Sequence, residues 1–220
     1  MEQLKFDLSK QYGNFKVLNA TNGGPWHKRY ANDQFRDNFE DYKAAGIPYS
    51  RNHDSAYCDV YGGPYSHDIT RIFPNFDADP YDPESYDFAC TDEDILVTLE
   101  AGTETFFRLG QSIEHQIKKY GTLPPKDFKK WAVICEHIIR HYNEGWADGL
   151  HLGIRYWCVW EEPNNQKLFD GPYEKYLELY STVAKAIKKE FPHLKVGGPN
   201  TMGLDDTMEQ FFRHCRDTET

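Results

Sequence analysis

The sequence predicts an α/β protein in which strands and helices alternate along the chain. Five short apolar runs begin near residues 15, 48, 104, 154 and 195, and each is followed by a segment with helical spacing of apolar residues. Such alternation is typical of parallel βαβ architecture with right-handed crossovers. By itself it allows either a doubly wound sheet or a barrel. No GxGxxG fingerprint follows the first strand, which counts against a dinucleotide-binding fold.

The first two units are read from short apolar runs and from their turn residues. Residues 15–18 predict strand one, and the glycine- and proline-containing stretch 22–26 predicts the loop after it. Aromatic residues then recur at helical spacing over 35–45. Strand two is predicted at 47–51 and ends in the polar run 52–54.

The third unit begins with a long connection. Residues 53–90 are predicted to form a βα loop, and its many aromatic side chains favour an ordered lid or rim. Thr91 with Asp94 has the spacing of a capping box at the start of the next helix. Strand three is predicted at 103–109, followed closely by Gln111.

The second half of the chain carries the clearest periodicity. Apolar residues keep the i, i+3, i+4, i+7 rhythm of a helix over 125–142 and again over 172–189. Between these helices lies the apolar run 154–160, which predicts strand four. A short strand at 194–197 and a helix around 208–215 complete the fifth unit.

Two adjacent glutamates end the fourth predicted strand. The run 154–160 is mostly aromatic or β-branched, which suits a strand buried on both faces of a parallel sheet. Glu161 and Glu162 follow at once, and Pro163 ends the strand. Acids at the C-terminal end of a parallel strand occupy the place where (β/α) barrels carry their chemistry. The simpler alternative is that both glutamates only begin a solvated loop.

The segment 160–163, Trp-Glu-Glu-Pro, resembles the Trp-Asn-Glu-Pro signature on strand four of retaining glycosidases. The resemblance is closest to glycoside hydrolase family 39, the β-xylosidase and α-L-iduronidase family, and runs from about residue 15 to the end. It implies a (β/α)8 TIM-barrel type fold, truncated after about five βα units. Residues 1–220 are then expected to form a single partial barrel domain. An oligomer partner or a missing C-terminal half is expected to cover the exposed edge of strand five.

The resemblance also implies roles for several residues. Glu162, directly before proline, falls on the general acid/base. Glu161 stands where the family has an asparagine that donates a hydrogen bond to the sugar 2-hydroxyl. A carboxylate only accepts such a bond, so Glu161 is expected to change the sugar preference or to prevent turnover. His53 and Gln111 fall on substrate-facing positions, although His53 could equally be a rim histidine bonded to Asp54.

Retention of configuration needs two carboxyl groups about 5 Å apart. In the family the second one, the nucleophile, lies on strand seven, which this sequence does not contain. Glu161 is a poor substitute, because neighbouring residues on one strand approach the same side of the sugar. Arg51, at the end of strand two, is expected to anchor the barrel floor through a buried carboxylate.

Composition argues against several other classes of protein. A formal net charge of −10 without a basic stripe argues against nucleic acid as a partner. The nine histidines show no HxH or HExxH spacing, so neither a metal nor another cofactor is expected. The five cysteines form no CxxC pair, the N-terminal residues contain no apolar h-region, and no stretch approaches the length of a membrane span. A cytoplasmic location is therefore expected.

The function predicted from these features is that of a β-xylosidase-like glycoside hydrolase of the retaining type. Its substrate would be an oligosaccharide or another glycoside. The alternative is a non-catalytic carbohydrate-binding or scaffold protein that keeps a degenerate glycosidase barrel. The strand-seven nucleophile that this sequence lacks and Glu161 in place of asparagine both favour this alternative for the chain taken alone.

Overall fold

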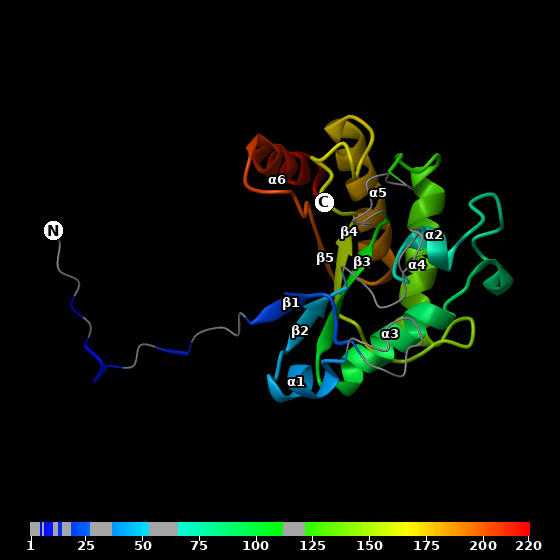
Figure 1. Ribbon diagram of the computed structural model, residues 1–220. Coiled ribbons are helices and arrows are strands. Elements are labelled where there is room, and N and C mark those ends of the chain that lie inside the picture. Colours follow the sequence, from blue (N-terminus) through cyan, green and yellow to red (C-terminus); the bar gives the residue numbers. More distant parts are fainter. Residues whose placement is uncertain are drawn as a thin grey trace.

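The computed structural model describes residues 5, 7–10, 13–14, 19–26, 37–52, 66–111 and 122–220. The strands form one parallel sheet in sequential order (Figure 1). These strands are β1 (Ala20–Asn22), β2 (Tyr49–Arg51), β3 (Glu104–Leu109), β4 (Tyr156–Val159) and β5 (Lys195–Gly197). The helices are α1 (Phe39–Ala44), α2 (Ile69–Ile72), the 3₁₀ helix η1 (Pro83–Ser85), α3 (Ala89–Glu100), α4 (Phe128–Glu144), α5 (Tyr173–Glu190) and α6 (Asp206–Thr218).

The strand order confirms the predicted α/β class and decides between its two forms. A doubly wound sheet reverses its strand order at a switch point, whereas successive units of a (β/α) barrel pair in the order of the chain. The described sheet runs β1-β2-β3-β4-β5 without a reversal. It therefore has the arrangement of five consecutive units of a (β/α) barrel.

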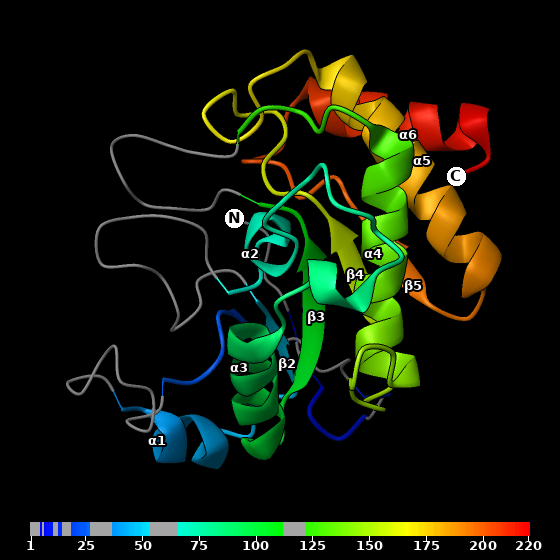
Figure 2. The ribbon, with the colours of Figure 1, turned by 90° about the vertical axis from the view of Figure 1, so that its right-hand side faces the viewer.

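Helices α3, α4 and α5 lie along one face of the sheet (Figures 1 and 2). Phe107 and Trp157 point from β3 and β4 into this layer, with their ring centroids 5.0 Å apart. The ring of Tyr142 on α4 lies 5.3 Å from that of Phe107. Side chains of period two along the same strands must then point to the opposite, inner face. There the rings of Phe106 and Tyr156 stack with centroids 4.3 Å apart.

The two long helices begin and end as local sequence signals require. Asp127 caps α4, because its carboxylate accepts hydrogen bonds from the amides of Lys129 and Lys130. Gly145, with φ of 76°, ends that helix in the left-handed conformation that glycine adopts without steric cost. Pro172 precedes the first residue of α5. The helices predicted over 125–142 and 172–189 are thereby confirmed, with α4 beginning slightly later than expected.

The capping box predicted from Thr91 and Asp94 is wrong. Helix α3 begins at Ala89, so Thr91 lies inside its first turn and donates its hydroxyl to the carbonyl of Ser66. The carboxylate of Asp94 pairs instead with the buried His67. Both side chains instead form long-range hydrogen bonds to the segment before α2. A local sequence motif does not predict contacts of this kind.

Two other predictions, both in the N-terminal half, fall partly outside the described residues. The predicted strand at 15–18 lies outside the described residues, and the observed strand β1 (Ala20–Asn22) overlaps the predicted loop at Asn22. Within the predicted long loop, 53–65 lies outside the described residues, and the described remainder contains α2 and η1. Across the described helices, none is both long and apolar enough to span a bilayer.

Candidate active site

The C-terminal ends of the parallel strands meet at one edge of the sheet, as they do in (β/α) barrels. Gly110 follows β3 there and lies against Trp160, which follows β4. A Cβ atom on Gly110 would come within 2.8 Å of the Trp160 Cα, so only glycine allows this approach. The Trp160 amide also donates to the Leu109 carbonyl at 3.0 Å. The segments that carry Gln111 and the two glutamates are therefore neighbours.

Glu161 is buried and forms an ion pair with Arg51. Its residue surface is only 4% exposed, and its carboxylate lies against the Arg51 guanidinium from β2. The Nε of Arg51 also donates to the Cys158 Sγ at 3.4 Å. The buried carboxylate that the sequence analysis expected for Arg51 is thus Glu161. A buried charge of this kind needs a partner of opposite sign, and the pair supplies it.

Glu162 lies in a strained turn directly above β4. Its φ is +37° and that of Trp160 is +65°, a left-handed region that bulky residues rarely adopt. The Glu162 amide donates to the carbonyl of Asn200 at 3.0 Å. The Glu162 carbonyl accepts from the Asn165 amide at 2.9 Å. The side chain is half-buried. Glu161 and Glu162 therefore differ in environment although they are adjacent.

A second buried ion pair lies beside the first. Arg108 on β3 and Asp68 before α2 are almost completely buried, and their Nη2 and Oδ1 atoms are 2.6 Å apart. The Arg108 amide donates to Asn52 Oδ1 at 2.9 Å, and the Asn52 side chain also contacts the buried His67. This network was not predicted from the sequence. Two local features of the sequence could have indicated it: Asn52 directly follows a strand, and Asp68 directly precedes a short apolar helix.

The predicted site residues are placed as follows. Gln111 is buried, with 5% of its surface exposed, at the end of β3. Glu161 and Glu162 follow β4, which pairs with β3. His53 lies outside the described residues, next to the described Asn52. The structure therefore brings three of the four predicted residues to one edge of the sheet. Asn200, which follows β5 at the same edge, was not predicted from the sequence.

The end of β4 is also fixed from the helix side. The hydroxyl of Tyr176 on α5 donates to the Val159 carbonyl at 3.4 Å. Burial raises the pKa of this hydroxyl well above its usual value, so it remains a neutral donor. The same hydroxyl lies 2.7 Å from where a Cβ on Gly198 would stand. Close packing of α5 thus holds the ends of β4 and β5 together.

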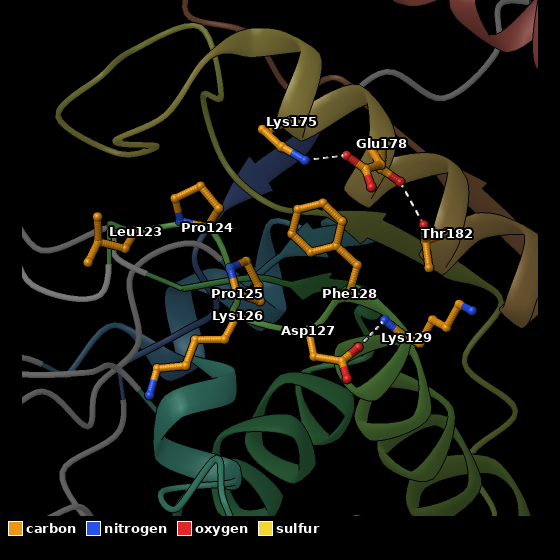
Figure 3. A pocket seen from close by; sticks show the side chains of 10 residues that line it. All are labelled: Leu123, Pro124, Pro125, Lys126, Asp127, Phe128, Lys129, Lys175, Glu178 and Thr182. Atoms are coloured by element: carbon orange, nitrogen blue, oxygen red, sulfur yellow. Dashed lines mark hydrogen bonds and ion pairs between the residues drawn. The ribbon is translucent and has the colours of Figure 1, made fainter.

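Three hollows open on the described surface, of which one of about 590 Å³ lies along α6 and contains no strand-end residue. A groove of about 330 Å³ follows the inner face of the sheet and is lined by Arg51, Phe106, Tyr156, Cys158 and Asn200, among others. A larger hollow of about 710 Å³ lies between the starts of α4 and α5, and Phe128, Lys175 and Glu178 line it (Figure 3). It contains none of the strand-end residues, so the inner groove and the edge above it form the candidate site. No cluster of His, Cys, Asp or Glu in the described parts of the chain could hold a metal ion.

The model of "Glycosyl hydrolases family 39" matches residues 51–220, which is well over half of the chain. The chain belongs to glycosyl hydrolase family 39. This confirms the resemblance drawn from the strand-four signature.

Two curated relatives match this chain over part of their length. A β-xylosidase of Geobacillus stearothermophilus is 35% identical over 101 residues, which make up 44% of this chain and 19% of that protein. A β-xylosidase of Caldicellulosiruptor saccharolyticus is 35% identical over 106 residues, 47% of this chain and 19% of that protein. The matched segment is thus about a fifth of each curated relative.

Solved structures show the same fold over nearly the whole chain. A glucosidase from Croceicoccus marinus superimposes with a TM-score of 0.74 at 26% identity, covering 96% of this chain and 43% of its own. A β-xylosidase from Caulobacter crescentus superimposes with a TM-score of 0.61 at 20% identity, covering 92% of this chain and 40% of its own. The chain therefore spans less than half the length of these two structures.

Proposed function

We propose that this chain carries the general acid/base of a retaining glycoside hydrolase, and that Glu162 is this residue. The observation that supports the proposal is the position of Glu162 in a family 39 chain. It follows β4 at the C-terminal edge of the sheet, directly before Pro163, and its amide donates to a carbonyl of the loop after β5.

The chemistry assigned to Glu162 is proton transfer to and from the glycosidic oxygen. In the first step its carboxyl group donates a proton to the leaving oxygen as the bond to the anomeric carbon breaks. In the second step its carboxylate accepts a proton from the water that releases the sugar. The half-buried position suits both steps, because the carboxyl group is reachable by substrate yet partly shielded from solvent.

The second carboxyl group of a retaining site must lie about 5 Å from the first. We assign it to strand seven of a barrel of this family, outside the five strands seen here. Glu161 does not take this role, because it follows the same strand end as Glu162. One strand end approaches one side of a sugar ring only.

The substrate proposed is a glycoside of the β-xyloside type, which the two β-xylosidase relatives support. Gln111 and Glu161 would contact the sugar from β3 and β4, and His53 from the residues that follow β2. Glu161 would accept a hydrogen bond where an asparagine would donate one. This exchange is expected to favour a hydroxyl or an amino substituent that donates to the carboxylate.

The test compares Glu162→Gln with Glu161→Asn in the full polypeptide that contains this sequence. Glu162→Gln keeps the shape and removes the proton. Turnover of alkyl glycosides, which have poor leaving groups, should fall on the order of 10²–10⁴-fold, the usual contribution of general acid catalysis. Bond cleavage in aryl glycosides with acidic phenols should fall much less.

Glu161→Asn is the matched control, since it alters the adjacent carboxylate without touching the proposed proton donor. It should change both substrate classes by a similar factor. Equal losses on both classes for Glu162→Gln would contradict the acid/base assignment. Sugar binding without turnover in the unaltered polypeptide would favour the carbohydrate-binding alternative.

A further inference from the structure

Two asparagines connect the turn that carries Glu162 to the loop after β5, and they do so reciprocally. Asn164 belongs to the β4 turn and bonds to the β5 loop. Asn200 belongs to the β5 loop and bonds to the β4 turn. Together these two residues are called the asparagine clasp below.

The first half of the clasp is Asn200. Its carbonyl oxygen accepts from the Glu162 amide at 3.0 Å. Its side-chain Nδ2 donates to the carbonyl of Trp160 at 3.2 Å and lies 3.5 Å from that of Val159. One residue therefore holds the backbone on both sides of Glu161. Its own φ is +51°, a left-handed conformation that asparagine adopts more readily than most residues.

The second half of the clasp is Asn164. Its Oδ1 accepts from the Met202 amide at 2.9 Å, and its Nδ2 donates to a carboxylate oxygen of Asp205 at 2.9 Å. Asp205 caps α6 by accepting from the Thr207 amide at 3.0 Å. Hydrogen bonds from Thr207, and then the one from Asn164, lower the pKa of the Asp205 carboxyl, which keeps it ionised as an acceptor. The β4 turn is thereby tied to the start of a helix.

The backbone of the turn needs such support. Trp160 and Glu162 both hold left-handed conformations, which are energetically unfavourable for non-glycine residues. Strained residues persist only where surrounding contacts over-determine them. The clasp supplies hydrogen bonds on both sides of the strained pair. Without them the turn would relax toward ordinary backbone angles and would move the Glu162 carboxyl group.

We propose that Asn164 and Asn200 are positioning residues that hold Glu162 in place from the neighbouring β5 loop. Neither residue needs to touch the substrate for this role. The kinetic consequence rests on the proposed function of Glu162, whereas the hold on the turn does not. A misplacement of a proton donor by about 1 Å is enough to lower turnover markedly.

The first test measures amide hydrogen exchange at Glu162 by NMR. Asn200→Gly keeps the left-handed backbone without strain and removes the Nδ2 donor, and Asn164→Ala removes the bonds to Met202 and Asp205. Each should speed exchange of the Glu162 amide about tenfold, which is roughly the effect of losing one hydrogen bond. Thr201→Val is the matched control, because its hydroxyl donates to the Gly203 carbonyl within the same β5 loop.

Buried amides of α4, such as that of Ile138, report on global unfolding, and their exchange should accelerate no more than that of Glu162 in either clasp variant. Unchanged exchange at Glu162 in both clasp variants would overturn the proposal. So would acceleration of the same size in Thr201→Val.

The second test asks whether the hold on the turn matters for proton transfer in the full polypeptide. Asn200→Gly should lower kcat about tenfold on alkyl glycosides and less on aryl glycosides, while KM changes less than twofold. Faster exchange at Glu162 without this dependence on the leaving group would overturn the positioning role. If Glu162→Gln itself shows no dependence on the leaving group, the proposed function of Glu162 is wrong. The exchange data would still decide whether the clasp holds the turn.

Discussion

The two faces of the described sheet differ although adjacent residues of the same strands form them. On the outer face, Phe107 and Trp157 are buried beneath α4 and α5. On the inner face, Phe106 and Tyr156 are only half-buried, and Arg51 lines the same groove. Arg108, two residues after Phe106 on β3, belongs to the same face but is fully buried. The period of two in a strand separates the functions: one face holds the fold together, and the other presents charged and aromatic groups at the candidate site.

The inner face also contributes less to the stability of the fold than the outer face. Its charged groups are buried as pairs, Arg51 with Glu161 and Arg108 with Asp68. Buried ion pairs contribute little net stability, because desolvation offsets most of the attraction. Their presence at the strand ends fits a role in arranging the site. Stability must then come chiefly from the outer face.

The largest expected effect separates two adjacent phenylalanines. Phe107→Ala should lower the free energy of unfolding by about 3–5 kcal/mol, since it opens a cavity among fully buried rings. Phe106→Ala on the inner face should cost only about 1 kcal/mol, near the centre of the distribution for point mutations. Chemical denaturation of both variants measures the difference. Equal losses would mean that the inner face supports the fold as much as the outer one.

Removal of one charge from the inner face should have the next largest effect. Arg51→Met leaves the Glu161 carboxylate buried without its cation and should lower the free energy of unfolding by about 3 kcal/mol. The double variant Arg51→Met with Glu161→Leu should recover most of this loss, because an apolar pair of similar volume replaces the ion pair. If the double variant is no more stable than the single one, Arg51 has a packing role that the ion pair does not explain.

A smaller effect is expected on the outer side, where His137 of α4 packs among aromatic rings. Burial, with a minor contribution from Arg140, lowers the pKa of His137 below the ordinary 6.5. The unfolded chain therefore binds the proton more readily, and stability should fall as pH drops below about 6.5 toward the folded pKa. His137→Gln should flatten this part of the curve of unfolding free energy against pH. An unaltered slope in the variant would assign the pH dependence to other groups.

Much of the fold could be predicted because its signals are local. The apolar rhythm of α4 and α5 and the compact aromatic run of β4 place these elements within a few residues of where they lie. The strand-four signature likewise carried the family assignment. Thr91 shows the limit of such reasoning, since its hydroxyl bonds to Ser66, which lies far away in the sequence.

The partners within the candidate site could not be predicted for the same reason. Arg51 and Glu161 are 110 positions apart, and nothing in either local sequence indicates that they meet. Asn200 follows β5, and only the parallel pairing of β4 with β5 brings it to Glu162. The predicted ends of the strands indicated which residues lie at the same edge of the sheet. Hydrogen bonds between loops, which depend on side-chain reach, required the structure.

The most direct test of the central claim is the product that Glu162→Gln forms from an aryl glycoside in the presence of azide. Azide needs no general base, so it can attack the glycosyl-enzyme intermediate when the base is missing. The account predicts that azide restores turnover and that mass spectrometry detects a glycosyl azide of retained configuration. Turnover that azide leaves unchanged, with the free sugar as the sole product, would contradict the assignment of Glu162 as the acid/base.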